Sequence, residues 1–282
     1  MLFNKCLNIE GTGANKLSEA KPTILKIGGS VITDKNGELA AKTEDINRIA
    51  EEIKRADIDN LVVVHGGGSF GHPTAKKYGI KDGLKDPSQK LGFSETHHVM
   101  TVLNGLIMDA FVWHELPALS ITPSSCVLTD NGRISFFDET VLRKCMGMGF
   151  VPVLYGDAVL DNKLGFTVLS GDQLVAYLAI KLKAEKIVIG VDTDGLYEAD
   201  PKVDKTAKPY LRLNLDQLKK VQAKIGKAQT TDVTGGMAGK IAELIPAVEA
   251  GISVQIINAT RNLRVLRGLT GEKIEGTIIE KA

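Results

Sequence analysis

A short apolar run passes into a glycine-rich loop at Leu61-Val-Val-Val-His-Gly-Gly-Gly-Ser-Phe-Gly-His72. Its β-branched residues predict a strand that is buried on both faces, as is typical of a parallel sheet. Three successive glycines let the backbone approach a ligand closely and expose its N–H groups, which suits a phosphate. His72, at the far side of the loop, could donate a hydrogen bond to the same anion, and its side chain titrates near neutral pH.

The same loop formally matches a dinucleotide-binding fingerprint, Gly66-x-Gly68-x-x-Gly71. That fingerprint normally occupies the first turn between a strand and a helix, whereas here an earlier strand, Thr23–Ile27, already ends in its own glycine pair. The expected acidic residue should follow after about 20 residues, and Asp82 comes too soon. We therefore set the dehydrogenase interpretation aside.

The bulk properties indicate a globular protein of ordinary composition. Its 282 residues, 43% of them hydrophobic and 24% charged, suffice for one large α/β domain or two lobes. A net charge of +1 gives no electrostatic case for a nucleic-acid or membrane partner. No window approaches the ~18 apolar residues of a membrane span.

The cysteines and the first residues bear on location. Three widely spaced cysteines form no C-x-x-C pair, and their odd number favours a reducing, cytoplasmic location over a disulfide framework. Residues 1–20 are polar and do not resemble a signal peptide, so we expect a flexible N-terminal extension there.

Strand-like runs alternate with helical patterns along the rest of the chain. We predict strands at Thr23–Ile27, Leu61–Val64, Ala118–Ile121, Val151–Tyr155, Lys186–Gly190 and Val254–Ile257, an edge strand at Gly276–Glu280, and helices at Asp45–Arg55, Phe93–Trp113, Asp172–Lys183 and Lys240–Ala250. This alternation predicts an α/β fold with a mostly parallel sheet and helices on both faces. Ligands bind at the carboxyl ends of the strands in such sheets. The polar, glycine-rich loops beyond residues 183–187 suggest a second ligand lobe.

Three lysines stand at or near glycine-rich loops. Lys26 ends the first predicted strand and precedes Gly28 and Gly29, so its ammonium group and the glycine N–H groups can converge on one anion. A solvated strand end would account for Lys26 equally well. Lys35 follows shortly, and Lys240 stands at a helix start after a loop that resembles a Walker A motif but fails it at two positions. Together they favour phosphoryl transfer, which needs positioning and charge neutralisation more than covalent chemistry.

Two further loops carry carboxylates. Asp172 lies at a loop-to-helix junction, where it could cap the helix or hold two lysines at a fixed separation. The loop 191–202 is dense in turn formers and could bind a nucleotide or be an ordinary acidic turn. His97 and His98 are adjacent on a predicted helix and therefore point in different directions, which indicates a surface or pocket feature and not a metal site.

Five motifs in order resemble those of the amino acid kinase superfamily: K-I-G-G-S at 26–30, G-G-G-S-F-G-H at 66–72, S-G-D at 170–172, V-D-T-D-G-L-Y-E-A-D-P-K at 191–202 and T-G-G-M-A-G-K at 234–240. Within it, S-F-G-H ending at His72 resembles the archaeal-type isopentenyl phosphate kinases. The resemblance covers roughly residues 22–282. It implies a three-layer αβα sandwich with a mostly parallel central sheet, usually as a homodimer, with an acceptor-binding lobe at 21–185 and a nucleotide-binding lobe at 186–282. It also implies ATP-dependent phosphorylation of isopentenyl phosphate, a phosphate monoester, with Mg²⁺ as cofactor.

The resemblance further implies roles for individual residues. Lys26 and Lys240 would contact the transferring phosphoryl group, Lys35 would stabilise the transition state, and Asp172 would orient the lysines. The catalytic set would be Lys26, Lys35, His72, Asp172 and Lys240, and the acceptor phosphate would be bound by Gly67, His72 and Gly171. The ATP side would comprise Lys26, Gly28, Gly29, Ser30, Gly68, Asp192, Tyr197, Lys202, Gly236 and Lys240. No metal-ligating side chain is assigned.

Two alternatives remain open. A phosphonate or fosfomycin-type kinase of the same superfamily would carry the same motifs, and a non-catalytic metabolite sensor would keep the fold, although four retained charged residues argue against a sensor. The apolar side of the helix 93–113 discriminates between the acceptors: Val99, Leu103, Leu106, Ala110 and Trp113 recur at helical spacing. They predict ordinary core packing, with a subset that could line a prenyl-sized pocket gated by Phe93, Met100 and Leu103.

Overall fold

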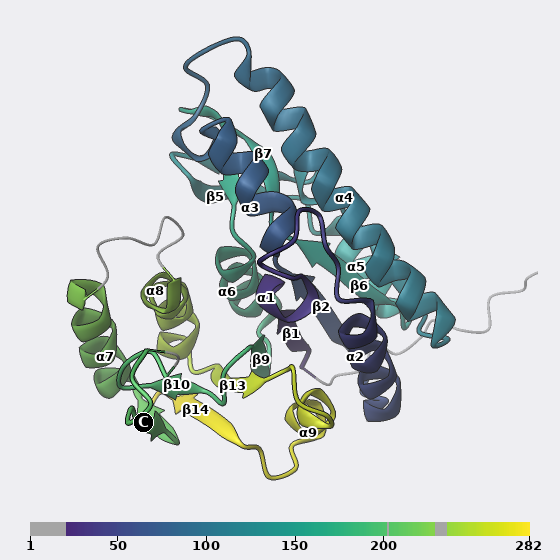
Figure 1. The fold of residues 1–282 in the computed structure, drawn as a ribbon. Helices are drawn as coiled ribbons and strands as arrows, with labels where there is room; N and C mark the ends of the chain where they lie inside the picture. The colour runs from purple at the N-terminus through teal and green to yellow at the C-terminus, as the bar shows by residue number, and fades with distance from the viewer. Residues whose placement is uncertain (1–20, 202, 229–235) are drawn as a thin grey trace, which may run out of the picture.

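An eight-stranded sheet forms the centre of the protein in a computed structural model that describes residues 21–201, 203–228 and 236–282 (Figure 1). Its strands, in spatial order, are β12 (Arg212–Asn214), β14 (Gly276–Glu280), β13 (Ser253–Asn258), β9 (Lys186–Val191), β1 (Thr23–Ile27), β2 (Leu61–His65), β6 (Val151–Tyr155) and β3 (Ala118–Ser120). Neighbours are parallel except β13 and β14, which pair antiparallel. The predicted boundary at 185/186 falls at β9, and strands from both sides of it share this sheet. The predicted extension 1–20 and Lys202 lie outside the described residues.

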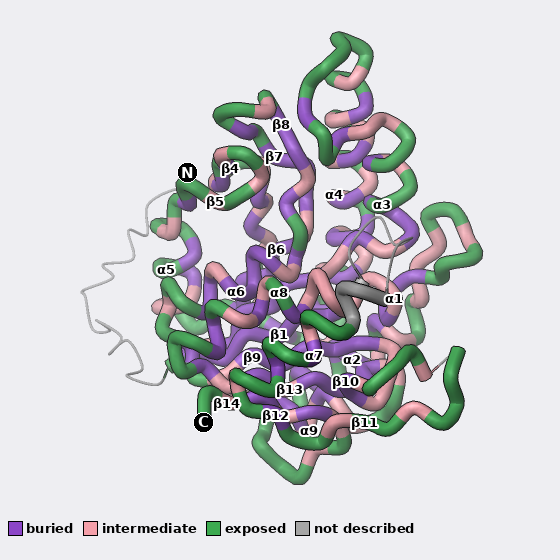
Figure 2. Tube along the Cα trace, turned by 90° about the vertical axis from the view of Figure 1, so that its left-hand side faces the viewer, coloured by how far each residue is buried: buried purple, intermediate pink, exposed green. Residues whose placement is uncertain are grey.

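Helices cover both faces of the sheet, which confirms the predicted three-layer α/β fold. Alternate strand residues enter two apolar cores; in β1, Leu25 faces one core and Ile24 the other. Side chains on one face pack against α1 (Gly29–Ile32), α2 (Thr43–Ala56), α4 (Gln89–Trp113) and α9 (Arg264–Thr270). The other face packs against α5 (Thr140–Gly147), α6 (Gly171–Leu182), α7 (Leu215–Ala228) and α8 (Gly236–Glu249). Because every residue of β1, β2 and β6 is buried, their sequences are mainly apolar rather than alternating, with Lys26 and His65 as buried polar exceptions near the strand ends. Figure 2 shows β1 and β6 as buried throughout.

A second, four-stranded sheet projects from one end of the molecule together with α3 (Gly68–Lys77) and part of α4 (Figure 1). Its order is β5 (Arg133–Phe137), β4 (Val127–Asp130), β7 (Asp157–Asp161) and β8 (Gly165–Leu169). The sequence did not predict this sheet. Shorter elements complete the chain: the 3₁₀ helices η1 (Ile80–Asp82) and η2 (Pro123–Ser125), and the pair β10 (Leu196–Tyr197) and β11 (Pro209–Tyr210).

Two sequence predictions about element positions are wrong. The last strand, β14, is not at the sheet edge, because β12 pairs with its outer side; β12 has only three residues and gives too short a pattern to recognise. The glycine loop predicted to extend to His72 ends at Gly67, and the chain from Gly68 onward is helical. In addition, α4 begins at Gln89, four residues before the predicted start.

Two further findings concern the described part of the chain. It contains no helix that is long and apolar enough to cross a membrane. Its two cysteines, Cys126 and Cys145, are both free thiols.

Candidate active site

The glycine loops after β1 and β2 pack directly against each other at the carboxyl end of the sheet. A Cβ atom built on Gly29 would lie 2.3 Å from the backbone nitrogen of Gly68, and one on Gly66 would lie 2.9 Å from that of Gly29. Gly68 also has a φ of +49°, which disfavours any side chain. This close approach explains why both loops are built from glycine, and it brings two stretches of backbone to one place.

Lys26, Asp172 and Lys240 form a compact ionic cluster beside these loops. The Nζ atom of Lys26 donates to Asp172 Oδ1 at 2.5 Å, and Lys240 Nζ lies 3.0 Å from both carboxylate oxygens. The side chains are 5%, 20% and 15% exposed, respectively. Three segments far apart in the sequence, from β1, α6 and α8, therefore meet at one carboxylate.

Burial and mutual charge set the ionisation of this cluster. Burial alone would raise the pKa of the Asp172 carboxyl, but the two ammonium groups outweigh it and hold that pKa well below its usual range. Burial lowers the pKa of Lys26 to about 7, with Asp172 opposing and Lys240 adding to the change. Burial would also lower the pKa of Lys240, yet Asp172 raises it overall. With both lysines charged, the cluster carries one positive charge more than the carboxylate neutralises, which prepares it for an anion.

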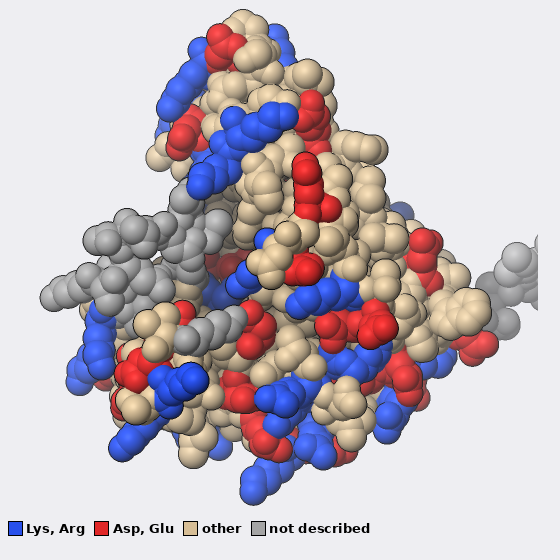
Figure 3. Space-filling view, viewed as in Figure 1, with Lys and Arg blue, Asp and Glu red and all other residues tan. Residues whose placement is uncertain are grey.

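The start of α6 adds backbone donors to the same place. Ser170 caps the helix by accepting a hydrogen bond from the Gln173 N–H at 3.1 Å. N–H groups in the first turn of a helix have no intrahelical partner and favour anions. A Cβ on Gly171 would lie 3.6 Å from Lys26 Cε, so this helix start adjoins the lysine. Figure 3 shows a recess between the projecting end and the base of the molecule, in which basic and acidic surface meet.

The predicted acceptor residues occupy the starts of two helices. Gly67 is the buried N-cap of α3, and Gly171 is the first residue of α6. His72 lies on the second turn of α3 and is exposed. It is therefore a helical residue one turn beyond the glycines, not the end of a loop.

The three residues predicted to gate the pocket have different surroundings. Met100 is buried against the glycine loop: a Cβ on Gly67 would lie 2.9 Å from its sulfur. Phe93 packs on Phe166 of β8 with ring centroids 5.3 Å apart. Leu103 is fully buried in the core between the sheet and α1, α2, α4 and α9, which favours the plain core interpretation for that residue. Trp113, predicted on the same apolar face, is 80% exposed.

The predicted ATP-side residues are partly brought together. Lys35 Nζ lies 3.7 Å from Asp192 Oδ2, which joins the loop after α1 to the end of β9. Ser30 lies in α1, and Tyr197 lies on the short strand β10 and is half-buried. Gly236 begins α8, so Lys240 stands in the second turn of that helix and not at its start as predicted.

Sequence reasoning missed two polar residues that support these loops. Thr33 Oγ1 accepts a hydrogen bond from the Ser69 N–H at 3.0 Å and donates to the Gly29 carbonyl at 2.7 Å, so it ties the two glycine loops together. His65, at the end of β2, is fully buried with Nε2 3.3 Å from Asn104 Oδ1. Burial lowers the pKa of His65 to about 4, so the ring is neutral at physiological pH. The one available signal was a histidine ending an otherwise apolar strand.

A family model described as "Amino acid kinase family" matches residues 21–258. The chain is 40% identical over 264 residues to the isopentenyl phosphate kinase of Methanothermobacter thermautotrophicus, with 91% of this chain and 98% of that protein covered. It is 37% identical over 269 residues to the isopentenyl phosphate kinase of Methanocaldococcus jannaschii, with 92% and 98% covered. A solved structure titled "X-ray structures of isopentenyl phosphate kinase" superimposes with a TM-score of 0.81 at 37% identity, covering 91% of this chain and 99% of that one.

Proposed function

Because this chain belongs to the amino acid kinase family, we propose that it transfers the γ-phosphoryl group of ATP to isopentenyl phosphate, giving isopentenyl diphosphate and ADP. The observation that carries this proposal is the buried cluster of Lys26, Asp172 and Lys240 at the glycine loops. The cluster combines excess positive charge with close backbone approach, which are the two requirements for bringing a nucleotide phosphate and an acceptor phosphate together.

In the proposed reaction, an oxygen of the acceptor phosphate attacks the γ-phosphorus of ATP. The bond from that phosphorus to the β,γ-bridging oxygen breaks, and ADP leaves with the electron pair. The acceptor oxygen is already an anion at pH 7, so the step needs no strong general base. Lys26 and Lys240 would contact the transferring group, and Lys35 would neutralise charge in the transition state. Asp172 would hold the first two lysines at a fixed separation.

Mg²⁺ is part of the proposal as a companion of ATP. In the described segments, no group of three or more His, Cys, Asp or Glu side chains could hold a metal ion. A site without such a group of side chains fits an ion that is held chiefly by substrate phosphates and water, as Mg²⁺ usually is in kinases. Bound there, the ion would neutralise phosphate charge, and we assign it no protein ligand.

Two lines of evidence support the choice of a phosphate acceptor with an apolar tail: the names of the relatives and the residues on the acceptor side of the site. Both relatives named above are isopentenyl phosphate kinases, and their similarity covers nearly the whole of this chain. His72 would bind the acceptor phosphate together with Gly67 and Gly171. Phe93 and Met100, on the same face of α4, would bound the tail. A phosphonate acceptor remains the rival.

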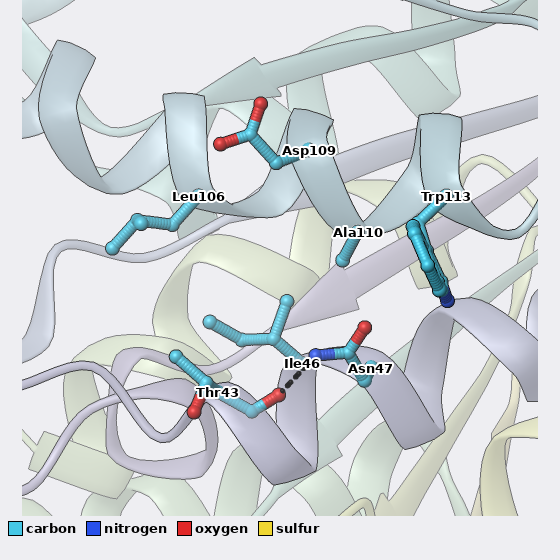
Figure 4. Close-up of a pocket in the computed structure, with 7 residues that line it drawn as sticks. All are labelled: Thr43, Ile46, Asn47, Leu106, Asp109, Ala110 and Trp113. Atoms are coloured by element: carbon cyan, nitrogen blue, oxygen red, sulfur yellow. Dashed lines mark hydrogen bonds between the residues drawn. The ribbon is translucent and has the colours of Figure 1, made fainter.

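We also propose a homodimer in a reducing, cytoplasmic setting. The strand β3 is at the sheet edge, and the adjoining surface of α4 exposes Trp113 and Val112, the latter by 65%. Figure 4 shows Trp113 beside a groove between α2 and α4 whose lining includes Ile46 and Ala110. This groove contains none of the predicted catalytic residues. A second copy would cover this apolar surface, and light scattering on wild type and Trp113→Glu would test it: the variant should shift toward monomer.

The test of the activity is ADP release in a coupled assay with a panel of acceptors. Isopentenyl phosphate should give the highest kcat/KM, ahead of a phosphonate such as fosfomycin and of the carboxylate acceptor N-acetylglutamate. A higher value for fosfomycin would replace the proposal with the phosphonate kinase. Tight ATP binding without turnover of any acceptor would favour the sensor.

A further inference from the structure

A second polar cluster lies outside the lysine site and joins three separate segments. His97 of α4 has its Nδ1 atom 3.1 Å from both carboxylate oxygens of Asp157, the first residue of β7. Ser124 of η2 donates its backbone N–H to Asp157 Oδ2 at 3.3 Å, and its Oγ lies 3.4 Å from the same histidine nitrogen. The Asp157 side chain is fully buried, whereas that of His97 is 31% exposed. Because the carboxylate only accepts hydrogen bonds, His97 must carry its proton on Nδ1.

The cluster lies between the two ends of the proposed acceptor site. On α4, Phe93, His97 and Met100 share one face because they are four and three residues apart. Met100 adjoins the glycine loop, and Phe93 packs on Phe166 of β8. On the β7 side of the His97–Asp157 contact, Asp157 directly follows Gly156. A Cβ built on Gly156 would lie 3.1 Å from the Gly171 nitrogen. The pair therefore stands between the phosphate-binding glycines and the aromatic pair.

Apolar packing holds the two halves of α4 unequally. The C-terminal half buries Leu103, Ile107 and Phe111 in the core that the sheet forms with α1, α2 and α9, and Asn104 donates to Ser120 Oγ at 2.7 Å. Before Met100, the buried residues of α4 are Gly92 and Thr96, and Phe93 packs against a separate, smaller apolar cluster that includes Ile80 and Phe166. Two polar contacts also hold this half: Gln89 donates to the Tyr78 carbonyl at 2.8 Å, and His97 hydrogen-bonds to the buried carboxylate of Asp157. Of the two, the bond from His97 reaches β7.

We propose that His97 is a positioning residue of the acceptor site, which ties the N-terminal half of α4 to β7 through Asp157. The inference rests on the proposed function, since it assigns the acceptor to this side of the glycine loops. With the tie intact, Phe93 and Met100 stand at a fixed distance from Gly67 and Gly171. The hydrogen bond to Asp157 also raises the pKa of His97, with partial burial opposing, so the charged form that strengthens the tie is favoured.

Without the tie, the donors to Asp157 that remain among the described residues are the backbone N–H groups of Ala158 and Ser124. A buried carboxylate that has lost its partner draws in water, and the N-terminal half of α4 loses its hydrogen bond to β7. The acceptor would then bind more weakly, while the lysine cluster and the ATP side stay unchanged because His97 contacts neither.

The experiment compares His97→Ala, His97→Asn and His97→Gln with the matched control His98→Ala, whose side chain is exposed on the same helix. An asparagine amide occupies the place of Nδ1 and can still donate to Asp157, whereas a glutamine amide occupies the place of Nε2. We measure kcat, both KM values and the calorimetric Kd for isopentenyl phosphate. His97→Ala should raise the acceptor KM and Kd at least roughly tenfold, as expected for one lost charge-assisted hydrogen bond, with kcat and the KM for ATP within about twofold of wild type. His97→Asn should recover most of this loss, and His97→Gln and His98→Ala should behave like the alanine variant and wild type, respectively.

Several outcomes would overturn the inference. Recovery by glutamine and not by asparagine would mean that Nε2 contacts the acceptor directly, so His97 would be a binding residue. An unchanged acceptor KM in all three variants would leave the bond a purely structural one. If His97→Ala fails to fold, the isosteric Asp157→Asn carries the test, with the same rise in acceptor KM expected. Wild-type protein that turns over no acceptor would refute the proposed function itself, whereas active wild type with unaffected variants refutes only the role of His97.

Discussion

Substitution of Asp172 by asparagine removes the charge that holds Lys26 and Lys240 together while keeping the shape of the side chain. Asp172 accepts from two ammonium groups at 2.5 to 3.0 Å, and its side chain is only 20% exposed. Breaking a buried ion pair costs about 3–5 kcal/mol; partial exposure and the amide oxygen, which can still accept one hydrogen bond, reduce the expected loss to about 2–3 kcal/mol. At about 2–4 °C per kcal/mol, Tm should fall by about 4–12 °C.

The same substitution should lower turnover by about 10²-fold, because two repelling ammonium groups no longer stand at a fixed separation. The assays are thermal unfolding and the coupled ADP assay at pH 7. The matched control is Asp130→Asn, which breaks an exposed pair with Lys163 at 2.8 Å and should leave both quantities nearly unchanged. Since the pKa of Asp172 is depressed in the fold, its contribution to stability is complete above the unfolded pKa and lost as pH falls through the folded pKa. Wild-type Tm and turnover in Asp172→Asn would refute the central role of this carboxylate.

Four other predictions concern single residues. Lys240→Ala should lower kcat by about 10²–10³-fold with circular dichroism unchanged; near-wild-type turnover would remove the residue from the mechanism. His72→Ala should weaken acceptor binding by roughly 10- to 150-fold in calorimetry and spare ATP, and an equal loss of ATP affinity would contradict its role as an acceptor ligand. Met100→Ala should raise kcat/KM for geranyl phosphate relative to isopentenyl phosphate, because it opens space beside the glycine loop; a stability loss with no change in that ratio would make Met100 ordinary core. Burial lowers the pKa of His65 from 6.5 to about 4 in the folded protein. The free energy of unfolding should therefore fall by about 3 kcal/mol as the pH falls from 6.5 to 4, at about 1.36 kcal/mol per pKa unit. Denaturant titrations should show a weaker pH dependence of this free energy in His65→Gln, and an equal slope in both proteins would rule out this cause.

The central layer of the fold was predictable because its strands are buried on both faces. A short continuous apolar run such as Leu61–Val64, followed closely by glycines, is typical of a buried parallel strand. The second sheet was not predictable in the same way. Its strands are partly exposed and give no continuous apolar run: in β4, Val127 is buried while the next residue, Leu128, is 36% exposed.

The helix α3 contradicts local propensity. It contains Gly68, Gly71 and Pro73, residues that disfavour helix interiors. Packing requires glycine at its start, since a Cβ on Gly68 would lie 2.8 Å from the backbone oxygen of Gly29. Tertiary contact therefore overrides propensity here, and no local pattern reports it.

The site was predictable as a set of loops but not as a geometry. Glycine-rich loops at strand ends indicated where an anion would bind, and the resemblance to a kinase family supplied the roles of the lysines. The contact between Lys26 and Asp172 spans 146 positions of sequence, and only the folded sheet brings these residues together. The tie between His97 and Asp157 likewise depends on how α4 crosses β7.

The most direct test of the central claim is ³¹P NMR of the reaction of ATP with isopentenyl phosphate. The account predicts that the monoester resonance is replaced by the two coupled resonances of a diphosphate while ADP accumulates at equal concentration, and that Lys240→Ala abolishes this conversion on the same timescale. An unchanged monoester resonance with folded wild-type protein, or a diphosphate formed equally fast by Lys240→Ala, would contradict it.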